Sequence, residues 1–551
     1  MRVAALRLPL ILADNLKVGC LKSWIYYISF CFSLKSKIRG PKQELRSNIA
    51  RLVDSQLVRE ALRGKPPKKQ SGSSEPAFSG IFYLTISRYY DKLLIILSNF
   101  KIASMNSRIF REYDIRGLVD IDLTDEVVFD LGRGFATYLS RLGKKYVIVG
   151  RDGRLSSPRF FGSLVEGMVA GGLNIVDVGV CPTPVFYFSL FHLNRDSGVM
   201  ITGSHNPPEF NGFKICVGKT TIHGNEIQGL RRIIEGQEFV EGKGTVFSRE
   251  IIPDYQAYLL KDIRLERPIK VVVDSGNGTA GAVAPKVLRD LGCEVIDLFS
   301  EIDGHFPNHH PDPTIPENMS ALIAEVQETG AEVGIGFDGD ADRLGAVDHL
   351  GNLIWGDQLL VLFAREVLSR HPGAIIVSEV KCSQNLYDDI ARNGGRGIMW
   401  KAGHSLLKSK MKEEGALLGG EMSGHIFFAD RYFGYDDAIY ASCRLLEILS
   451  RSNRRIPDFL GDLPRTWNTP EIRVDCPDDL KFELVEKVRE SFRGEIPLVD
   501  VDGVRLLFPD GWGLVRASNT QPVLVLRFEA RSEKRLGEIR ELVEKRVAQF
   551  S

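Results

Sequence analysis

The sequence predicts a multidomain α/β protein in which three α/β domains precede a smaller C-terminal α+β domain. Its 551 residues suffice for several domains, and 44% hydrophobic with 26% charged residues is typical of a globular chain with a sizeable core. Continuous β-branched runs that end in glycines and precede helical periodicity indicate buried strands between helices. Such runs lie at 146–149, 269–274 and 374–380. The turns after the first two resemble each other, which indicates a repeated α/β unit.

Candidate domain boundaries lie near residues 251–253, 358–369 and 457–464. The last stretch, 470–551, contains three strand-like runs and then a charged helix from Glu533 to the end. We therefore expect α/β domains at 105–254, 255–366 and 367–464, and the α+β domain at 465–551.

The segment 1–104 differs in character from the rest, with 18 Lys and Arg against 6 Asp and Glu. Its apolar runs at 24–34 and 81–100 are too short or too charged for a transmembrane span. Met105 is the first methionine after Met1, and it directly precedes the first strongly patterned segment. We expect 1–104 to be poorly structured, or a spurious extension upstream of a start at Met105. A membrane-associating or partner-binding extension is the alternative.

The net charge and the spacing of the cysteines disfavour several functional classes. A net charge of +0 provides no global basic field for nucleic acid. The 8 cysteines are widely spaced without a C-x-x-C pair, which is typical of reduced thiols and disfavours a disulfide framework or a zinc ribbon. We expect a cytoplasmic protein that binds neither nucleic acid nor a membrane.

The first motif that carries chemistry is a loop at 202–214, which follows a predicted strand at 197–201. Glycine, asparagine and two prolines place Ser204 on a stiff exposed turn, where its hydroxyl could accept a phosphate. Lys214 lies ten residues further on and could return to the transferred group. A plain surface loop is the alternative. A serine-hydrolase triad has little support, because His205 is the only general base beside the serine.

The second motif contains Asp338, Asp340 and Asp342 after an apolar strand. Carboxylates at every second position of an extended segment point to one side, and a divalent cation would relieve their repulsion. Mg2+ suits carboxylate and phosphate oxygens. An EF-hand calcium loop requires Gly and Glu where Arg343 and His349 stand, so that interpretation fails. A solvated acidic loop remains the alternative.

Three further signals are weak individually. His404 follows a glycine turn close to a lysine and could act as an acid or base near neutral pH, although a lone histidine is more often structural. Glu421 and Ser423 stand two residues apart on a loop and fit adjacent hydroxyls of a sugar. Arg516 precedes hydroxyl, amide and backbone donors that could form an anion cradle; an ordinary Ser/Asn turn is the alternative.

Taken together and in this order, the five motifs resemble those of the α-D-phosphohexomutase superfamily. The resemblance covers 105–551, including an opening FREYDIRG at 110–117. Segments 420–428, 431–437 and 511–522 are similar to the bacterial bifunctional phosphomannomutase/phosphoglucomutase branch. Met422 speaks against the phosphoglucosamine mutase branch.

The resemblance implies four domains around a central cleft, each contributing one loop. It implies that Ser204 carries a phosphoryl group and, with Asp338, Asp340 and Asp342, holds one Mg2+ per chain. The implied groups at the transferred phosphate are Arg116, Lys214 and Arg343, with His404 as acid or base. The implied substrate-binding residues are Tyr113, Lys381, Glu421, Ser423, His425, Arg516, Ser518, Asn519 and Thr520.

The resemblance further implies a reaction. Hexose 1-phosphate and hexose 6-phosphate, of mannose, glucose or both, would interconvert through a hexose 1,6-bisphosphate. Glucose 1,6-bisphosphate would act as activator. The enzyme would be a monomer whose only partner is the small hexose phosphate. A phosphoglucosamine mutase, a phosphatase and a non-catalytic sugar-phosphate-binding relative are the alternatives.

The chain departs from the family pattern at Gly203, Ala341 and Ala402, where alanine, glycine and threonine are frequent. The first two exchanges are small-for-small, and we expect them to be tolerated. The third removes a hydroxyl that could contact the substrate.

Overall fold

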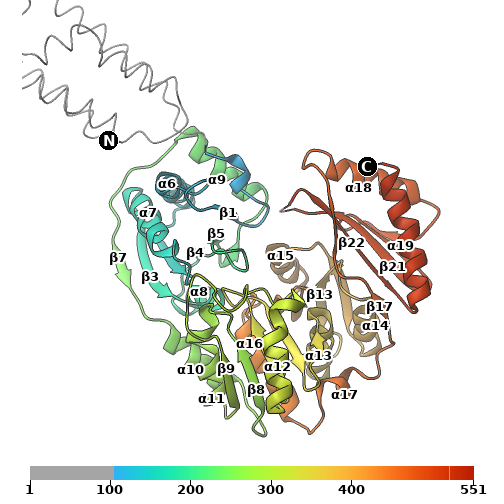
Figure 1. Ribbon diagram of the computed structural model, residues 1–551. Coiled ribbons are helices and arrows are strands. Elements are labelled where there is room, and N and C mark those ends of the chain that lie inside the picture. Colours follow the sequence, from blue (N-terminus) through green and yellow to red (C-terminus); the bar gives the residue numbers. More distant parts are fainter. Residues whose placement is uncertain (1–104, 520, 551) are drawn as a thin grey trace, which may run out of the picture. The chain divides into compact units, whose positions relative to one another are not determined.

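The computed structural model describes residues 105–519 and 521–550. The expectations for 1–104 and for Thr520 lie outside these residues. The described part contains four β-sheets, which we call sheets I to IV in chain order (Figure 1). Within it, no helix combines the length and the apolar character needed to cross a bilayer.

Sheet I is mixed, with the strand order β1-β5-β4-β2-β3-β7 and β6 paired to β5. Its strands are β1 (Ile115–Leu118), β2 (Tyr146–Arg151), β3 (Asn174–Val180), β4 (Ser197–Ile201), β5 (Phe210–Val217), β6 (Thr220–Thr221) and β7 (Val246–Ser248). Its helices are α6 (Asp125–Arg141), α7 (Ser157–Ala170), α8 (Thr183–His192) and α9 (Asn225–Gly236), preceded by the 3-10 turn η1 (Ser107–Ile109). Thr124 caps α6 by accepting from Val127 N, and two acidic residues in the first turn complement the helix dipole.

Sheet II has the order β12-β11-β10-β8-β9. Its strands are β8 (Lys270–Asp274), β9 (Glu294–Leu298), β10 (Val333–Phe337), β11 (Leu344–Asp348) and β12 (Leu353–Ile354). The accompanying helices are α10 (Ile252–Asp262), α11 (Ala284–Asp290) and α12 (Ser320–Thr329), with 3-10 turns η2 (Thr279–Ala282) and η3 (Pro316–Met319). The central strands β8 and β10 are almost wholly buried, as their uninterrupted apolar runs predict.

Sheet III has the order β14-β13-β15-β16. Its strands are β13 (Ile375–Glu379), β14 (Arg396–Trp400), β15 (Leu418–Gly420) and β16 (Ile426–Phe428). Its helices are α13 (Gly356–Arg370), α14 (Gln384–Arg392), α15 (His404–Glu414), α16 (Ala438–Ser450) and α17 (Ile456–Leu460). The boundary expected at residue 366 falls inside α13.

Sheets I, II and III share one topology. In each, a central strand (β2, β8 or β13) is parallel to both neighbours, and one neighbour (β4, β10 or β15) turns back into an antiparallel strand. The three antiparallel pairs are β4–β5, β10–β11 and β15–β16. Their connecting loops leave the carboxyl ends of parallel strands, where α/β proteins place their ligands. These loops contain Ser204, the three aspartates and Glu421.

Sheet IV differs, because it is antiparallel with the order β17-β22-β21-β20-β19, and β18 also pairs with β22. Its strands are β17 (Trp467–Asn468), β18 (Ile472–Asp475), β19 (Leu498–Val499), β20 (Val504–Phe508), β21 (Gly511–Ala517) and β22 (Val523–Ala530). Two helices accompany it, α18 (Lys481–Phe492) and α19 (Glu533–Ala548). The sequence analysis found three strand-like runs and one helix here. The structure adds the strands β17, β18 and β19, which at 2 to 4 residues are too short to form a pattern, and the helix α18.

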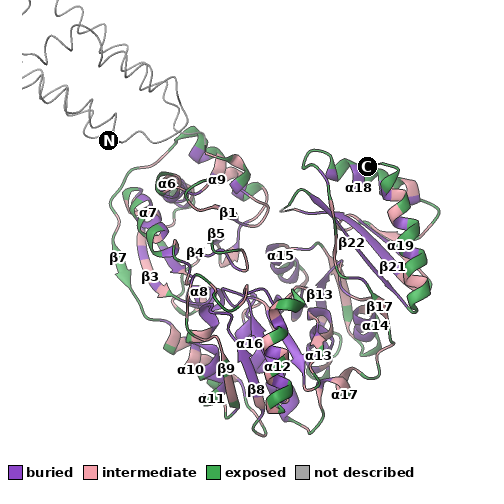
Figure 2. Ribbon diagram, viewed as in Figure 1, coloured by how far each residue is buried: buried purple, intermediate pink, exposed green. Residues whose placement is uncertain are grey.

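Figure 2 shows the burial of the strand layers, including β8, β13, β21 and β22. One apolar cluster joins α8 of the first domain to sheet II and to α13 and α16 beside sheet III. Helix α16 is buried on all sides. This shared core connects the elements from which the loops at 202–209, 338–343 and 421–425 extend.

Candidate functional site

The loop after β4 brings Ser204 against the loop after β10. The Ser204 hydroxyl donates to Asp338 Oδ2 at 2.9 Å, and the residue has φ +49°. Its side chain is buried, with a relative exposure of 3%, so the expected exposed turn is wrong. The aspartate loop covers it closely: a Cβ atom on Gly339 would lie 2.6 Å from the Ser204 carbonyl oxygen.

The three aspartates form a compact turn rather than an extended segment. Asp338 Oδ1 accepts from the backbone N–H of Asp342 at 3.0 Å and of Arg343 at 3.1 Å, and Ala341 has φ +61°. One carboxylate oxygen from each of Asp338, Asp340 and Asp342 lies within 4.8 Å of the others, and all three residues are buried. The carboxylates therefore converge, although through a turn instead of strand alternation.

Two residues of the first domain hold this acidic turn. Lys214 Nζ on β5 donates to Asp340 Oδ2 at 2.7 Å and also bonds Asp342 Oδ2. Thr183, the first residue of α8, donates its hydroxyl to Asp340 Oδ2 at 2.6 Å. Burial disfavours the Lys214 ammonium, but the two aspartates outweigh it and raise its pKa. Burial and the neighbouring carboxylates raise the pKa of Asp338.

The donor set fits a hard divalent cation. The Oδ1 atoms of Asp340 and Asp342 are buried and have no hydrogen-bond partner among the described residues. Unpartnered buried carboxylate oxygens are costly unless a ligand satisfies them. With Asp338 Oδ2 and the Ser204 hydroxyl beside them, they offer the oxygen-only coordination that Mg2+ prefers.

Cationic side chains surround the serine loop. Arg116 on β1 donates to Asn206 Oδ1 at 2.7 Å and to Asp114 at 2.6 Å, while its Nε is buried without a partner among the described residues. Arg343 leaves the aspartate turn and donates from Nε to His425 Nε2 at 3.0 Å. The structure thus brings Arg116, Lys214 and Arg343 around one site.

His404 and His425 meet at one carboxylate that the sequence interpretation missed. Their Nδ1 atoms lie 3.5 Å and 3.2 Å from Asp436 Oδ2. Lys408 Nζ lies 2.9 Å from Asp436 Oδ1. Burial, followed by the nearby Lys408 charge, lowers the pKa of His404 well below its ordinary value, so the imidazole is neutral. Asp436 lies in the 431–437 segment, but its spacing gave no sign of this contact.

Glu421 and Ser423 lie together in the loop after β15. The Ser423 hydroxyl donates to Glu421 Oε2 at 3.0 Å, and Gly403 N donates to Glu421 Oε1 at 2.6 Å. Glu379, at the end of β13, fixes this loop by accepting from Met422 N at 2.9 Å. Burial raises the pKa of Glu379 to about 7. Sequence reasoning missed Glu379, because a single acid ending a strand carries no distinguishing pattern.

Lys381 lies two residues after Glu379. Its Nζ is 2.7 Å from Glu471 Oε1 and 3.4 Å from Glu379 Oε2. Burial opposes the Lys381 charge, yet the two glutamates raise its pKa. Lys381 is therefore a charged ammonium at the edge of the Glu421 loop.

The loop between β21 and β22 contains the predicted anion cradle. Arg516 Nε donates to Asp502 Oδ2 at 2.9 Å, and its buried Nη2 has no partner among the described residues. Ser518 Oγ accepts from Gln521 N at 3.2 Å. Arg516 therefore retains a donor that an anion could occupy.

Tyr113 connects this cradle to the first domain and to the His404 segment. The Asn519 amide donates to the Tyr113 hydroxyl at 2.5 Å, and that hydroxyl donates to the Ala402 carbonyl at 2.9 Å. Loops of all four sheets are thus linked by direct contacts among predicted site residues.

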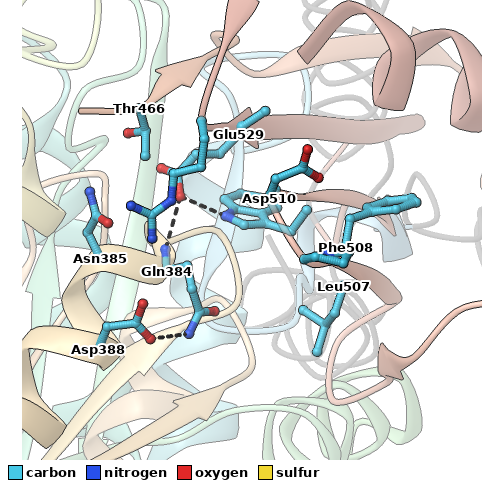
Figure 3. A pocket seen from close by; sticks show the side chains of 13 residues that line it. Gln384, Asn385, Asp388, Thr466, Leu507, Phe508, Asp510 and Glu529 are labelled. Atoms are coloured by element: carbon cyan, nitrogen blue, oxygen red, sulfur yellow. Dashed lines mark hydrogen bonds between the residues drawn. The ribbon is translucent and has the colours of Figure 1, made fainter. Parts of the chain in front are cut away.

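A separate cavity of about 250 Å³ lies between α14 and strands β20 to β22 (Figure 3). Gln384, Asp388, Phe508 and Glu529 are among its lining residues. None of the predicted site residues lines it.

Comparisons with known proteins agree with this arrangement. Family models for phosphoglucomutase/phosphomannomutase match as α/β/α domain I at 107–241, domain II at 253–351, domain III at 355–467 and the C-terminal domain at 471–546. A phosphomannomutase/phosphoglucomutase of Pseudomonas aeruginosa is 49% identical over 445 residues, covering 81% of this chain and 96% of that protein. A phosphoglucomutase of Neisseria gonorrhoeae is 45% identical over 442 residues, covering 79% and 96%.

A solved structure leads to the same family. The crystal structure of a phosphoglucomutase/phosphomannomutase family protein from Burkholderia thailandensis has a TM-score of 0.76 and 44% identity, covering 81% of this chain and 98% of that one. The four matched domains and the shared architecture confirm the expected fold of three α/β domains and a C-terminal α+β domain. This chain belongs to the phosphoglucomutase/phosphomannomutase family and is a phosphohexomutase.

Proposed function

We propose that this protein interconverts hexose 1-phosphate and hexose 6-phosphate through a phosphorylated Ser204 and a hexose 1,6-bisphosphate. The contact of Ser204 Oγ with Asp338 Oδ2, beside two unpartnered carboxylate oxygens, carries this proposal. Phosphoryl transfer needs positioning and charge neutralisation more than covalent chemistry, and this site supplies both.

Ser204, Asp338, Asp340 and Asp342 would hold one Mg2+, which when bound neutralises charge on the transferred phosphoryl group. Lys214, Arg116 and Arg343 add positive charge around the same phosphoryl group. Lys214 also keeps the aspartate turn in place through Asp340 and Asp342. The serine oxygen is thereby aimed at the acceptor hydroxyl before the substrate arrives.

The substrate would bind with its own phosphate on Arg516, Ser518, Asn519 and Thr520. Arg516 Nη2, which has no hydrogen-bond partner among the described residues, supports this assignment, because a guanidinium binds phosphate through paired donors. Tyr113 and Lys381 would border the sugar, since each contacts a loop that carries other candidate residues. The phosphate and the reacting hydroxyl would then lie at opposite ends of one site.

His404 would accept the proton of the attacking hydroxyl, because its buried imidazole is neutral and has a nitrogen free of a proton. Ser204 gives its phosphoryl group to that hydroxyl, and the resulting bisphosphate turns over and returns its other phosphate to Ser204. Glu421 and Ser423, with His425 beside them, would bind the 3- and 4-hydroxyls in either orientation. Glucose 1,6-bisphosphate would therefore activate dephosphorylated enzyme.

Mannose and glucose phosphates are both proposed substrates. The similarity to the Pseudomonas aeruginosa phosphomannomutase/phosphoglucomutase and to the Neisseria gonorrhoeae phosphoglucomutase supports this choice. Glucosamine phosphate is the competing substrate. Relative kcat/KM for the three sugar 1-phosphates decides between them.

The test incubates the protein with Mg2+, a trace of glucose 1,6-bisphosphate and either mannose 1-phosphate or glucose 1-phosphate, and measures 6-phosphate and free phosphate. We expect conversion of both sugars without net phosphate release. Ser204→Ala should abolish conversion, while Ser163→Ala on α7 should not. Net phosphate release would indicate a phosphatase, and no conversion by folded, phosphorylated protein would contradict the proposal.

A further inference from the structure

The turn between β2 and α7 contains a buried ion pair that the proposed chemistry does not use. Arg154 is 1% exposed and Asp152 is 2% exposed, and Arg154 Nε lies 3.2 Å from Asp152 Oδ2. Both belong to the glycine-rich segment 150–158, one of the repeated turns of the sequence. A buried guanidinium is tolerated only when its donors are satisfied.

All five N–H donors of Arg154 find acceptors. Nε donates to Asp152; Nη1 donates to the carbonyls of Pro207 at 2.6 Å and Phe210 at 3.0 Å; Nη2 donates to the carbonyls of Ser204 at 2.8 Å and Asn206. Asp152 Oδ2 in turn accepts from Gly203 N at 3.1 Å. One ion pair therefore ties the backbone from the residue before Ser204 to the start of β5.

The planar guanidinium is essential to this arrangement. Lysine has three donors on one nitrogen and cannot reach four carbonyls that lie on two sides of a fork. The loop also packs directly on the guanidinium: a Cβ atom on Gly203 would lie 2.4 Å from Arg154 Nε. Alanine, which is frequent at this position in the family, would therefore conflict with Arg154 in this chain, because Arg154 could yield only by breaking its hydrogen bonds.

We propose that Arg154 is the positioning residue of the nucleophile. It fixes the Ser204 backbone at φ +49°, the conformation in which the hydroxyl meets Asp338 Oδ2. A non-glycine residue in this left-handed region is strained and needs surrounding structure to hold it. The proposal rests on the proposed function, since it assigns Arg154 to the phosphoryl-carrying serine.

The test compares Arg154→Lys and Gly203→Ala with wild type in the full chain. It measures kcat and KM for glucose 1-phosphate, and the rate at which glucose 1,6-bisphosphate phosphorylates Ser204, by intact mass. We expect kcat and the phosphorylation rate to fall together by about 10- to 100-fold, because small misplacements of a reacting group cost that much. KM should change by less than about threefold, because the Arg516 loop is untouched.

Arg444→Lys is the matched control. Arg444 is equally buried, but it bonds Asp430 and Glu366 beside sheet III. Its replacement should lower Tm about as much as Arg154→Lys does, yet leave kcat and serine phosphorylation at wild-type values. This control separates a loss of positioning from a general loss of stability.

Wild-type kcat and phosphorylation in Arg154→Lys would overturn the inference, whatever the change in Tm. If Arg154→Lys does not fold, Gly203→Ala decides, and undiminished kcat in that variant would overturn it equally. A wild-type protein that neither converts glucose 1-phosphate nor forms phosphoserine would reject the proposed function itself, and the inference with it.

Discussion

At the scale of single residues, the close approach of the serine and aspartate loops depends on two backbone positions of the aspartate loop, Gly339 and Ala341. The Ser204 carbonyl packs so closely against Gly339 that a Cβ atom there would lie 2.6 Å from its oxygen. Ala341 has a left-handed backbone conformation with φ +61°. The first position requires the absence of a side chain, and the second bears a side chain under strain. The two should therefore respond oppositely to exchange.

We expect Gly339→Ala to reduce kcat by about 10- to 100-fold, because a methyl group 2.6 Å from the Ser204 carbonyl forces the loops apart. Ala341→Gly should keep kcat and raise stability by up to about 1 kcal/mol, because relief of left-handed strain exceeds the added entropy of the unfolded chain. Steady-state kinetics and thermal unfolding check both. Equal kinetics for the two variants would contradict this account.

Glu379 is expected to make the stability of the protein depend on pH. Burial raises its pKa to about 7 from an ordinary value of 4.5. A raised pKa contributes stability that is fully present below the unfolded value and is lost as pH rises through the folded value. The relevant window therefore runs from about pH 4.5 to 7.

Glu379→Gln should remove the pH-dependent contribution of this side chain to stability, because the amide stays neutral at every pH. Its oxygen can still accept a hydrogen bond from Met422 N. Between pH 5 and pH 8 the free energy of unfolding of wild type should fall by up to a few kcal/mol relative to that of the variant. The expected slope is ~1.4 kcal/mol per pH unit between the unfolded and the folded pKa. Urea unfolding at both pH values measures the difference. Parallel profiles of the two proteins would show that Glu379 does not titrate in this range.

At the scale of elements, the first residue of helix α8 in the first domain holds the candidate metal ligand Asp340 of the second domain through hydrogen bonds. Thr183, at the first position of α8, binds Asp340 twice, through its backbone N–H to the carbonyl and its hydroxyl to Oδ2. Asp340 Oδ1 remains buried without a hydrogen-bond partner among the described residues. Groups that orient a ligand commonly change metal affinity by 10- to 100-fold when removed.

We therefore expect Thr183→Val to raise the Mg2+ concentration for half-maximal activity by about tenfold, while Thr183→Ser restores it. Activity measured across a Mg2+ titration, with Tm as a check on folding, distinguishes the variants. An unchanged Mg2+ requirement in Thr183→Val would show that Lys214 alone orients Asp340.

At the scale of the whole described chain, loops separated by 406 positions meet through Tyr113 and Asn519. The Tyr113 hydroxyl contacts both Asn519 and the Ala402 carbonyl, so one group joins three of the candidate loops. The contact therefore includes a residue of the anion cradle. Its loss should affect substrate binding more than the chemistry at Ser204.

Tyr113→Phe should raise KM for hexose 1-phosphate by about 2- to 10-fold with little change in kcat, as expected for loss of one or two hydrogen bonds. Asn519→Ala should act similarly, and the double variant should be less than additive, because both remove one interaction. Full additivity in the double-mutant cycle would mean that the two residues bind the substrate independently.

The sequence by itself determined the α/β class, the central strands of three sheets, and the candidate residues Ser204, Asp338, Asp340 and Asp342. These features are local, since apolar runs, glycine turns and spaced carboxylates lie in short segments. The resemblance of five ordered motifs also identified the family. The short strands of sheet IV were not predicted, because strands of 2 to 4 residues are too short to form a pattern. Helix α18 was also missed, although its buried apolar residues recur at helical spacing.

Only the tertiary structure decided which other side chains complete the site. Arg154, Thr183 and Glu379 act through contacts with residues at least 43 positions away, and Asp436 acts through contacts with His404, Lys408 and His425. The sequence neighbours of these four residues give no indication of the contacts. The burial of Ser204 likewise depends on the loop after β10, which lies 134 positions along the chain. Local sequence sets secondary structure, but the satisfaction of buried charges depends on which loops the packed sheets bring together.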